Sequence, residues 1–341
     1  MKTPLFFLYA VVTVCTGCID AAEVAGEYRV LSKDVVGGDG SWDYLTIDPD
    51  ARRLYIARET RVIVFDMDAH KVIKEIDKTN GVHGVALVSE FNRGYISNGR
   101  DNTITIFDLK TSEKIGEVKA GPKPDAIVCD PGSHRVFAFN NGGTTATAIE
   151  AETGAVAGNI ELGGAPEFAV SDGKGHMYVN LEDKNEIAEF DPATLKVLNH
   201  WPLAPGTTPT GLAMDREHRR LFSGCRGSKT LVVVDADTGK VVADPPIGAG
   251  VDAAAFDVST QTVFSSNGDG TLTVIHEDTQ DKYSVVQNLV TQPGARTMAF
   301  DPKKHQLWLV AAETKPPPET EPNKRKKVIV PGTFSVICVG K

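Results

Sequence analysis

Hydrophobic and polar positions alternate along much of this chain, in short segments rich in β-branched residues. Residues 62–66 (VIVFD) and 103–108 (TITIFD) show the pattern, and each segment ends in an aspartate. Turn-forming runs such as Asp48-Pro49-Asp50 and Asp130-Pro131-Gly132 separate the segments. Alternation with a period of two is typical of β-strands that bury one face. The pattern therefore predicts an all-β protein built from short strands.

A longer repeat organises these strands. A unit of the form small/polar–apolar–x–apolar–x–Asp recurs at intervals of about 42 residues. Its last position falls at Asp48, Val88, Asp130, Asp172, Asp215, Asp257 and Asp301. An aromatic residue follows in every unit, at Tyr55, Tyr95, Phe137, Tyr178, Phe222, Phe264 and Trp308. Four short strands fill such a unit, as in one propeller blade, so we predict a seven-bladed β-propeller with four-stranded antiparallel blades.

The two ends of the repeat predict how the ring closes. In the last unit the third strand is expected at residues 333–339, close to the last residue given, so an outer strand is missing. Residues 27–31 (EYRVL) precede the first inner strand and belong to no unit. Pairing them into the last blade would remove an exposed edge. We therefore predict one propeller domain over residues 27–341, with a Pro-rich charged insertion at 313–327 forming a surface loop of blade 7.

Four units share a further motif: residues 95–98 (YISN), 137–140 (FAFN), 178–180 (YVN) and 264–267 (FSSN). This motif resembles the signature of YVTN-repeat, YncE-like propellers, and residues 98–108 (NGRDNTITIFD) also fit that family. The resemblance covers roughly residues 27–341, although blades 1, 5 and 7 carry Arg58, Cys225 and Ala311 near the Asn position. It implies an exported bacterial seven-bladed propeller, most often without an assigned activity.

The first residues of the chain predict export. Lys2 precedes an apolar run at residues 5–14 (LFFLYAVVTV), which is too short for a membrane-spanning helix and suits a signal peptide. Gly17-Cys18 resembles a bacterial lipobox, although Cys15 stands where that motif usually has Leu. We expect a signal peptide at 1–18, a lipidated Cys18, and a protein in the periplasm or at the cell surface that meets the membrane only through this anchor. A plain secreted protein is the alternative.

Charge and cysteine content exclude several classes. The chain has 36 basic and 45 acidic residues, and its net charge of −9 would repel a phosphate backbone, so no nucleic-acid partner is expected. Cys129, Cys225 and Cys338 lie far apart and indicate neither a disulfide framework nor a zinc site. Nucleophile and phosphate-binding motifs such as G-x-S-x-G or a P-loop are missing from the sequence. We expect a monomer, with the question of enzymatic activity open.

Polar residues are predicted to gather at one mouth of the central channel. In a four-stranded meander, the start of the inner strand and the loop between the second and third strands reach the same face. The starts of the inner strands, which we call the mouth residues, are Asp43, His83, Asp125, Glu167, Thr210, Asp252 and Arg296. The second-to-third-strand loops add Arg58, Asn98, Arg100, Asn140, Asn180, Arg226 and Asn267. Polar groups that converge in a concavity are the default hypothesis for a ligand-binding site.

Several uses of this mouth remain open. Asp43, His83, Asp125 and Glu167 could bind a hard divalent cation, the one cofactor the sequence suggests. Alternatively, Asp125 or Glu167 could act as a general base, with Arg296 stabilising an oxyanion, as lactone hydrolysis by related propellers would require. The mouth could also be a polar surface without a specific task, or one that docks another macromolecule.

The first functional hypothesis is a non-enzymatic envelope module that binds a small molecule or an envelope protein. The alternative is a lactonase-like hydrolase or lyase, with or without a metal ion.

Four histidines recur just before the second strand, on the opposite face: His134, His176, His218 and His305. They are interpreted as turn residues, too far apart to bind one ion together.

Overall fold

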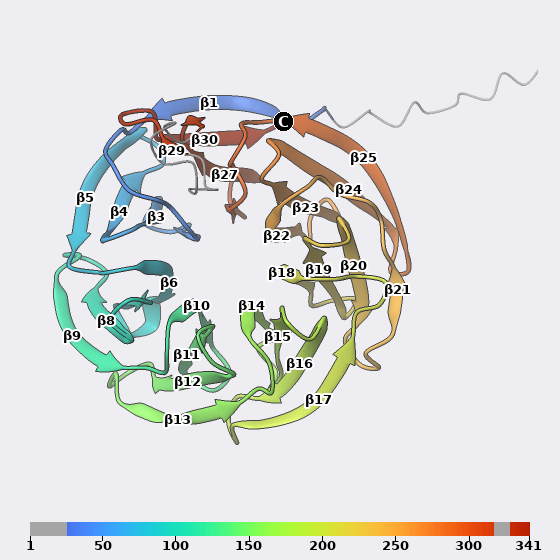
Figure 1. Cartoon of the computed structure of the whole chain (residues 1–341), viewed down its shortest axis with the longest axis horizontal. Coiled ribbons are helices and arrows are strands. Elements are labelled where there is room, and N and C mark those ends of the chain that lie inside the picture. Colours follow the sequence, from blue (N-terminus) through green and yellow to red (C-terminus); the bar gives the residue numbers. More distant parts are fainter. Residues whose placement is uncertain (1–25, 317–327) are drawn as a thin grey trace, which may run out of the picture.

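The computed structural model describes residues 26–316 and 328–341. Over these residues the chain forms seven blades of four antiparallel strands, arranged in a ring (Figure 1). The predicted seven-bladed, all-β propeller is therefore confirmed. One 3-10 turn, η1 (Ser89–Phe91), is the only helical segment in the described part of the chain. The predicted signal peptide with Cys18, and residues 317–327 of the insertion, lie outside the described residues.

Each blade runs outward from an inner strand at the channel. Blade 1 contains β2 (Leu45–Asp48), β3 (Arg53–Arg58), β4 (Arg61–Asp66) and β5 (Lys71–Asp77). Blade 2 contains β6 (Val82–Val88), β7 (Arg93–Asn98), β8 (Thr103–Asp108) and β9 (Lys114–Lys119). Blade 3 contains β10 (Pro124–Asp130), β11 (Arg135–Asn140), β12 (Thr145–Glu150) and β13 (Val156–Glu161). Blade 4 contains β14 (Pro166–Ser171), β15 (Met177–Leu181), β16 (Glu186–Asp191) and β17 (Lys196–Pro202).

The remaining blades follow the same plan. Blade 5 contains β18 (Pro209–Asp215), β19 (Arg220–Cys225), β20 (Thr230–Asp235) and β21 (Val241–Ala243). Blade 6 contains β22 (Val251–Asp257), β23 (Thr262–Asn267), β24 (Thr271–Thr279) and β25 (Lys282–Val290). Blade 7 contains β26 (Met298–Asp301), β27 (Gln306–Ala311), β30 (Ser335–Gly340) and β1 (Arg29–Val35).

Blade 7 is completed by the N-terminal strand. Its order is β1-β30-β27-β26, and β1 pairs with β30 in antiparallel register from Arg29 opposite Gly340 to Val35 opposite Ser335. Ring closure by an N-terminal strand is therefore confirmed, with the strand a few residues further along the chain than the predicted 27–31. Tyr28 just before β1 also contacts blade 6, because its ring meets Phe264 edge-on at 5.1 Å. The closing strand therefore ties two blades together.

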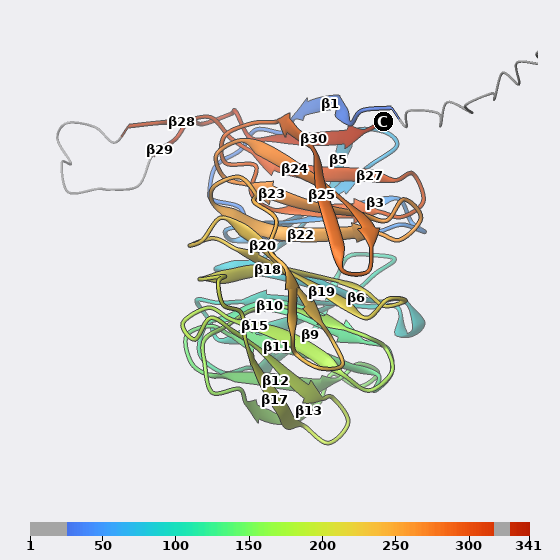
Figure 2. The ribbon, with the colours of Figure 1, turned by 90° about the vertical axis from the view of Figure 1, so that its right-hand side faces the viewer.

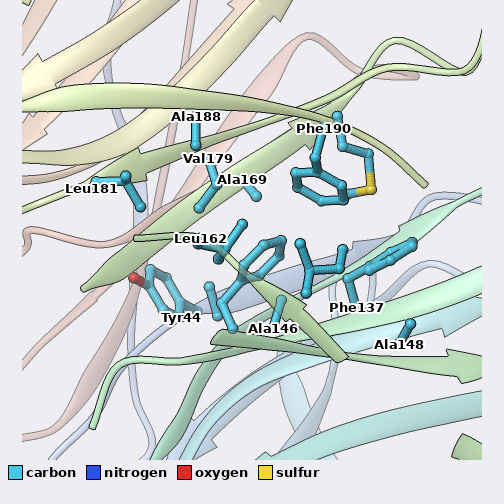
Figure 3. Close-up of a cluster of buried hydrophobic side chains, with 14 residues drawn as sticks. Tyr44, Phe137, Ala146, Ala148, Leu162, Ala169, Val179, Leu181, Ala188 and Phe190 are labelled. Atoms are coloured by element: carbon cyan, nitrogen blue, oxygen red, sulfur yellow. The ribbon is translucent and has the colours of Figure 1, made fainter. Parts of the chain in front are cut away.

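The core consists of layers between neighbouring blades. The aromatic column predicted from the repeat lies on the second strands, and all seven of its residues are buried. Between blades 3 and 4, Phe137 meets Phe190 with ring centroids 5.5 Å apart, beside Leu162 and Val179 (Figure 3). Because both faces of each second strand are covered by other blades, a large apolar side chain is needed in every unit.

A short ribbon leaves blade 7 on one face of the ring. β28 (Thr314–Lys315) pairs with β29 (Val328–Ile329), between β27 and β30, and both project from the body of the propeller (Figure 2). This connection is the second-to-third-strand loop, so it lies on the face of the channel mouth. Thr314 and Ile329 line a cavity of about 290 Å³ together with Trp42 and Arg296. Within the described residues, no helix has the length and hydropathy needed to cross a membrane.

Candidate functional site

In five blades the mouth residue lies at an irregular point of the inner strand, while Asp43 and Arg296 lie just before β2 and β26. The pairing between the first and second strands shifts register just there, between Val82 and Val85, Pro124 and Ile127, Pro166 and Ala169, Pro209 and Leu212, and Val251 and Ala253. A bulge of this kind releases one residue from the ladder and re-aims its side chain. The repeat therefore places a polar side chain at the channel mouth in blade after blade.

Three mouth residues from blades 1 to 3 meet directly. His83 Nδ1 lies 2.6 Å from Asp43 Oδ2 and 3.4 Å from Asp125 Oδ1. Burial raises the pKa of Asp43 to about 6, against the hydrogen bond from His83. Burial lowers the pKa of His83, but the hydrogen bond to Asp43 and the two carboxylate charges outweigh it and raise that pKa overall. The imidazole therefore gains a proton readily between the two aspartates.

Two arginines balance the opposite side of the mouth. Arg296 Nε lies 3.1 Å from Asp252 Oδ2, and its Nη2 lies 4.0 Å from Asp43 Oδ1. Arg226 also pairs with Asp252 and lies 3.9 Å from Glu182 Oε1. Burial raises the pKa of Asp252, while the two guanidinium groups oppose that rise. The buried carboxylate is thus held by two cations from neighbouring blades.

These contacts join into one chain around the mouth. Each of the seven blades contributes one member, and we call the set the polar ring: Asp125, His83, Asp43, Arg296, Asp252, Arg226 and Glu182. Asn141 of blade 3 donates to Glu167 of blade 4 at 3.1 Å, so a hydrogen bond also joins the two blades whose ring members, Asp125 and Glu182, are not paired with each other. Lys123 adds a further positive charge, 3.5 Å from Asp125 Oδ2. Positive and negative groups therefore alternate around most of the mouth.

The polar ring surrounds a concavity that we call the funnel. An aromatic pair forms its floor. Tyr44 of blade 1 donates its hydroxyl to Glu167 Oε2 of blade 4 at 3.4 Å, and its ring lies 5.2 Å from that of Phe168. Figure 3 shows Tyr44 at the edge of the apolar cluster, with its oxygen pointing away from it. Beyond this pair, the inner strands line a largely apolar cavity of about 430 Å³. Each inner strand thus presents a polar residue first and apolar residues further into the channel.

Glu167 is the most strongly perturbed acid at the mouth. Burial raises its pKa to about 9, and the charges of Asp125, Glu182 and Asp252 add to this rise. At neutral pH the carboxyl group is therefore protonated and can donate a hydrogen bond. The structure brings Glu167 to Tyr44 and Asn141, and separately groups Asp43, His83 and Asp125 as the set able to hold a metal ion.

Several residues predicted to bind a ligand make hydrogen bonds within the propeller. Asn98, Asn140 and Asn267 each donate their side-chain amide to two threonine hydroxyls of the following strand, at 2.9–3.1 Å. Asn180 donates to the carbonyl oxygens of Thr210 and Gly211 in the next blade. These side chains hold turns and blades together, which explains the recurring Asn of the motif.

Arg58 and Thr210 are also used internally. The Arg58 side chain is fully buried, lies 3.9 Å from the Phe334 ring centroid, and donates to Ser41 O at 3.1 Å. Its burial lowers its pKa to about 10. The Thr210 hydroxyl donates to Gly224 O and Val251 O. The Thr210 hydroxyl is thus used between blades, whereas Arg58 Nε and Nη2 have no hydrogen-bond partner among the described residues and lie buried beside Phe334.

Two basic residues at the edge of the mouth, Arg100 and Lys123, are exposed and can contact a ligand. Arg100 is exposed and pairs with Glu59 at 3.1 Å. A cavity of about 370 Å³ beside it is also lined by Asp43, His83 and Lys123. Lys123 was missed in the sequence because it lies two residues before the mouth position. Its neighbourhood of Asn141 and Asp125 gives the rim both donors and acceptors.

The sequence contains a pattern that distinguishes Tyr44 from the equivalent residues of most other blades. The residues that follow the mouth position in each blade are Tyr44, Gly84, Ala126, Phe168, Gly211, Ala253 and Thr297. Five of these residues are small and two are aromatic. The aromatic ones, Tyr44 and Phe168, come from blades 1 and 4, whose side chains meet across the channel. The small residues leave the space that these two rings fill.

Comparison with known proteins supports the fold and goes no further. No protein-family model and no curated protein sequence matches the chain. Among solved structures, a chain of the mitotic checkpoint complex superposes with a TM-score of 0.72 at 13% identity, covering 91% of this chain and 96% of that one. A chain of Kuenenia stuttgartiensis hydrazine synthase superposes with a TM-score of 0.51 at 16% identity, covering 71% and 96%. At these identities the likeness is one of fold, and the chain is a seven-bladed β-propeller.

Proposed function

We propose that this protein is an exported binding module of the cell envelope, which takes up a polar ligand at the funnel. The observation that carries the proposal is the polar ring, to which all seven blades contribute one charged side chain. Rigid, mutually paired groups lose little conformational entropy when a ligand binds, and this favours recognition over flexible contact. A surface without a task would not need paired charges to be half-buried there.

The chemistry of the funnel defines the ligand class. Carboxylates of Asp43 and Asp125 accept hydrogen bonds, while Arg226, Arg296 and Lys123 donate them. Glu167 adds a protonated carboxyl group at neutral pH. The Tyr44 ring limits the depth, so a ligand rests on an aromatic floor. These features fit a small molecule with several polar groups, or a polar loop of an envelope protein.

Export rests on the first residues of the chain. The apolar run at 5–14 and the Gly17-Cys18 step support a signal peptide and a lipid anchor. The resemblance to YVTN-repeat propellers, carried by four of the seven blades, supports the same location. The predicted partners are therefore small molecules or proteins that reach the envelope.

A thermal-shift screen of polar small molecules tests the binding proposal. A ligand should raise the melting temperature of the wild type and leave that of Arg296→Ala unchanged. Lys303→Ala serves as a matched control, because Lys303 is an exposed cation of the opposite face that pairs with Asp50. If every stabilising molecule raises the melting temperatures of Arg296→Ala and of the wild type equally, binding does not occur at the polar ring.

A hydrolase or lyase at the same funnel is the second candidate. The 2.6 Å contact between Asp43 and His83 provides a base and a group that orients it, and Glu167 provides a proton donor. Arg296 would stabilise an oxyanion. Comparing ester and lactone hydrolysis by the wild type and His83→Ala tests this candidate. Equal rates for the two proteins would exclude it.

A metal-assisted form of this reaction would use Asp43, His83 and Asp125. Their ligand atoms lie within 4.8 Å of one another, but Lys123 and Arg296 already supply positive charge to these carboxylates. A divalent ion would have to displace them. If one binds, it should raise the melting temperature of the wild type, and the double change Asp125→Ala with Glu167→Ala should abolish that rise.

A further inference from the structure

A second group of metal-ligand side chains lies on the opposite face, between blades 5 and 6. Asp215 ends β18, His218 follows in the next turn, and Glu277 lies on β24. His218 Nδ1 lies 2.7 Å from Asp215 Oδ2 and 3.5 Å from Glu277 Oε1. One ligand atom from each residue falls within 4.8 Å of the others, which is the span around a single ion. We call these residues the blade 5–6 cluster.

The polar atoms of the cluster are incompletely satisfied. Asp215 Oδ1 accepts the Glu217 N–H at 2.8 Å, and Glu277 Oε1 accepts the Tyr283 hydroxyl at 3.2 Å. Glu277 Oε2 has no hydrogen-bond partner among the described residues, and Asp215 Oδ2 and His218 Nδ1 make no hydrogen bond, although they lie 2.7 Å apart. The two acidic side chains are 0% and 1% exposed. Unpaired buried carboxylate oxygens are costly, so such an arrangement calls for a compensating charge.

Three other blade junctions show one way in which this position is compensated. There the aspartate that ends the inner strand is paired with a cationic residue of the next blade, which has positive φ and precedes the second strand, whereas Asp130 of blade 3 instead accepts hydrogen bonds from the Ser171 hydroxyl and the Ser133 N–H. These pairs are Asp172 with Arg219 at 2.8 Å, Asp257 with His305 at 3.0 Å, and Asp301 with Arg52 at 2.6 Å. In blade 6 the same position is Gln261, whose amide donates to Val258 O.

The junction between blades 5 and 6 therefore lacks the internal cation. In its place Glu277 brings a second carboxylate toward Asp215. Burial raises the pKa of Glu277, and the charge of Asp215 adds to this rise. The charges of His218 and Arg220 oppose this rise, but the Arg220 guanidinium is itself held by Asp235 at 2.9 Å and Asp281 at 2.8 Å. Within the cluster, two buried carboxyl groups therefore face a single imidazole.

We propose that the blade 5–6 cluster binds a divalent cation of the Zn²⁺ or Mn²⁺ class, with Asp215, His218 and Glu277 as its ligands. One imidazole and two carboxylates suit these ions, whereas Ca²⁺ and Mg²⁺ prefer oxygen ligands alone. Three protein ligands leave a position for water, and His218, which is 37% exposed, gives access from solvent. The ion would replace the missing cation and join two blades, independently of the function proposed for the funnel.

This site changes the interpretation of His218. The sequence placed it among turn residues too widely separated to share an ion. The four histidines are far apart, but a carboxyl group of the neighbouring blade, that of Glu277, lies beside His218. His305, the histidine two blades further on, meets only one carboxylate and so provides a natural control.

The test measures Zn²⁺ and Mn²⁺ binding by calorimetry and melting temperature, on the purified protein after treatment with a chelator. Glu277→Gln keeps the shape of the side chain and removes its charge, so the metal-free variant should be at least as stable as the metal-free wild type. Its affinity for the ion should fall more than about tenfold, because losing even an outer-shell partner of a ligand typically costs about that much. His218→Ala should show the same loss.

Two controls separate this site from others. His305→Ala should bind the ion as the wild type does, and Glu277→Gln should cause the same loss of affinity in a His83→Ala background, which lacks the imidazole of the funnel. The proposal is overturned if neither ion stabilises the wild type. It is also overturned if Glu277→Gln and the wild type bind with equal affinity.

Discussion

The Tyr44 hydroxyl of blade 1 donates a hydrogen bond to the Glu167 carboxyl group of blade 4, across the central channel, at 3.4 Å. This contact defines the depth of the funnel. It also places an aromatic ring between the polar ring and the apolar cavity, so that the two spaces have different chemistry.

Two substitutions of Tyr44 should show separately how much its hydroxyl and its ring contribute to the free energy of unfolding. Tyr44→Phe should lower the free energy of unfolding by about 1 kcal/mol, since one hydrogen bond is lost. Tyr44→Ala should lower it by about 3–5 kcal/mol, because a large buried side chain leaves a cavity. Urea denaturation measures both. Equal losses for the two variants would mean that the ring does not pack as a floor.

The funnel acids predict an unusual dependence of stability on pH. The pKa values of Asp43 and Glu167 are raised to about 6 and about 9, so the folded state binds more protons than the unfolded state between pH 4 and 9. The free energy of unfolding should therefore fall as pH rises through this range. The raised pKa of His83 acts in the same direction, because its stabilising charge is lost at high pH.

Acid denaturation sets the other limit. Asp235 and Asp257 have lowered pKa values, through hydrogen bonds that outweigh their burial, and their contribution is lost as pH falls through the folded pKa. Stability should thus be greatest in mild acid. Glu167→Gln should flatten the decline between pH 5 and 9, while the exposed Glu152→Gln should leave it unchanged. Melting temperatures that rise from pH 5 to 8 in the wild type would contradict this account.

The closing strand offers a test of the ring. Deleting residues 27–32 removes half of β1 and exposes the edge of β30 in blade 7. The truncated protein should aggregate or melt at a clearly lower temperature, and light scattering with calorimetry would detect both. An unchanged melting temperature would show that β1 is not needed for closure.

Processing of the N-terminus is a separate prediction. If Cys18 carries a lipid, Cys18→Ser should move the protein from the membrane fraction to the soluble fraction of a bacterial host. The same experiment with Cys338→Ser, a buried thiol of the propeller, controls for effects of losing any cysteine. If the wild type and Cys18→Ser distribute equally between the membrane and soluble fractions, the lipobox prediction is wrong.

The fold was predictable because each blade repeats the same physical requirements. A buried aromatic, a turn-forming aspartate and alternating strands recur with one period, so even the outer strand missing from blade 7 could be inferred. The mouth residues were predictable for the same reason. Asn98 and Asn140 share their face, yet sequence position alone did not reveal that threonine hydroxyls occupy their amides.

Contacts between blades lie beyond such reasoning. The Tyr44–Glu167 contact joins blades 1 and 4, and the approach of Glu277 to Asp215 joins a third strand to an inner strand of its neighbour. No sequence period relates these positions. Their distances depend on how blades tilt and pack, which the repeat does not specify.

The most direct test of the funnel as a binding site is the NMR spectrum of the histidine imidazoles during titration with a ligand found by the screen. His83 is the one histidine of the polar ring, whereas His218 and His305 lie on the opposite face. The account predicts that the His83 resonances shift in proportion to occupancy while those of His218 and His305 stay in place. Movement of the latter two with a stationary His83 would contradict it.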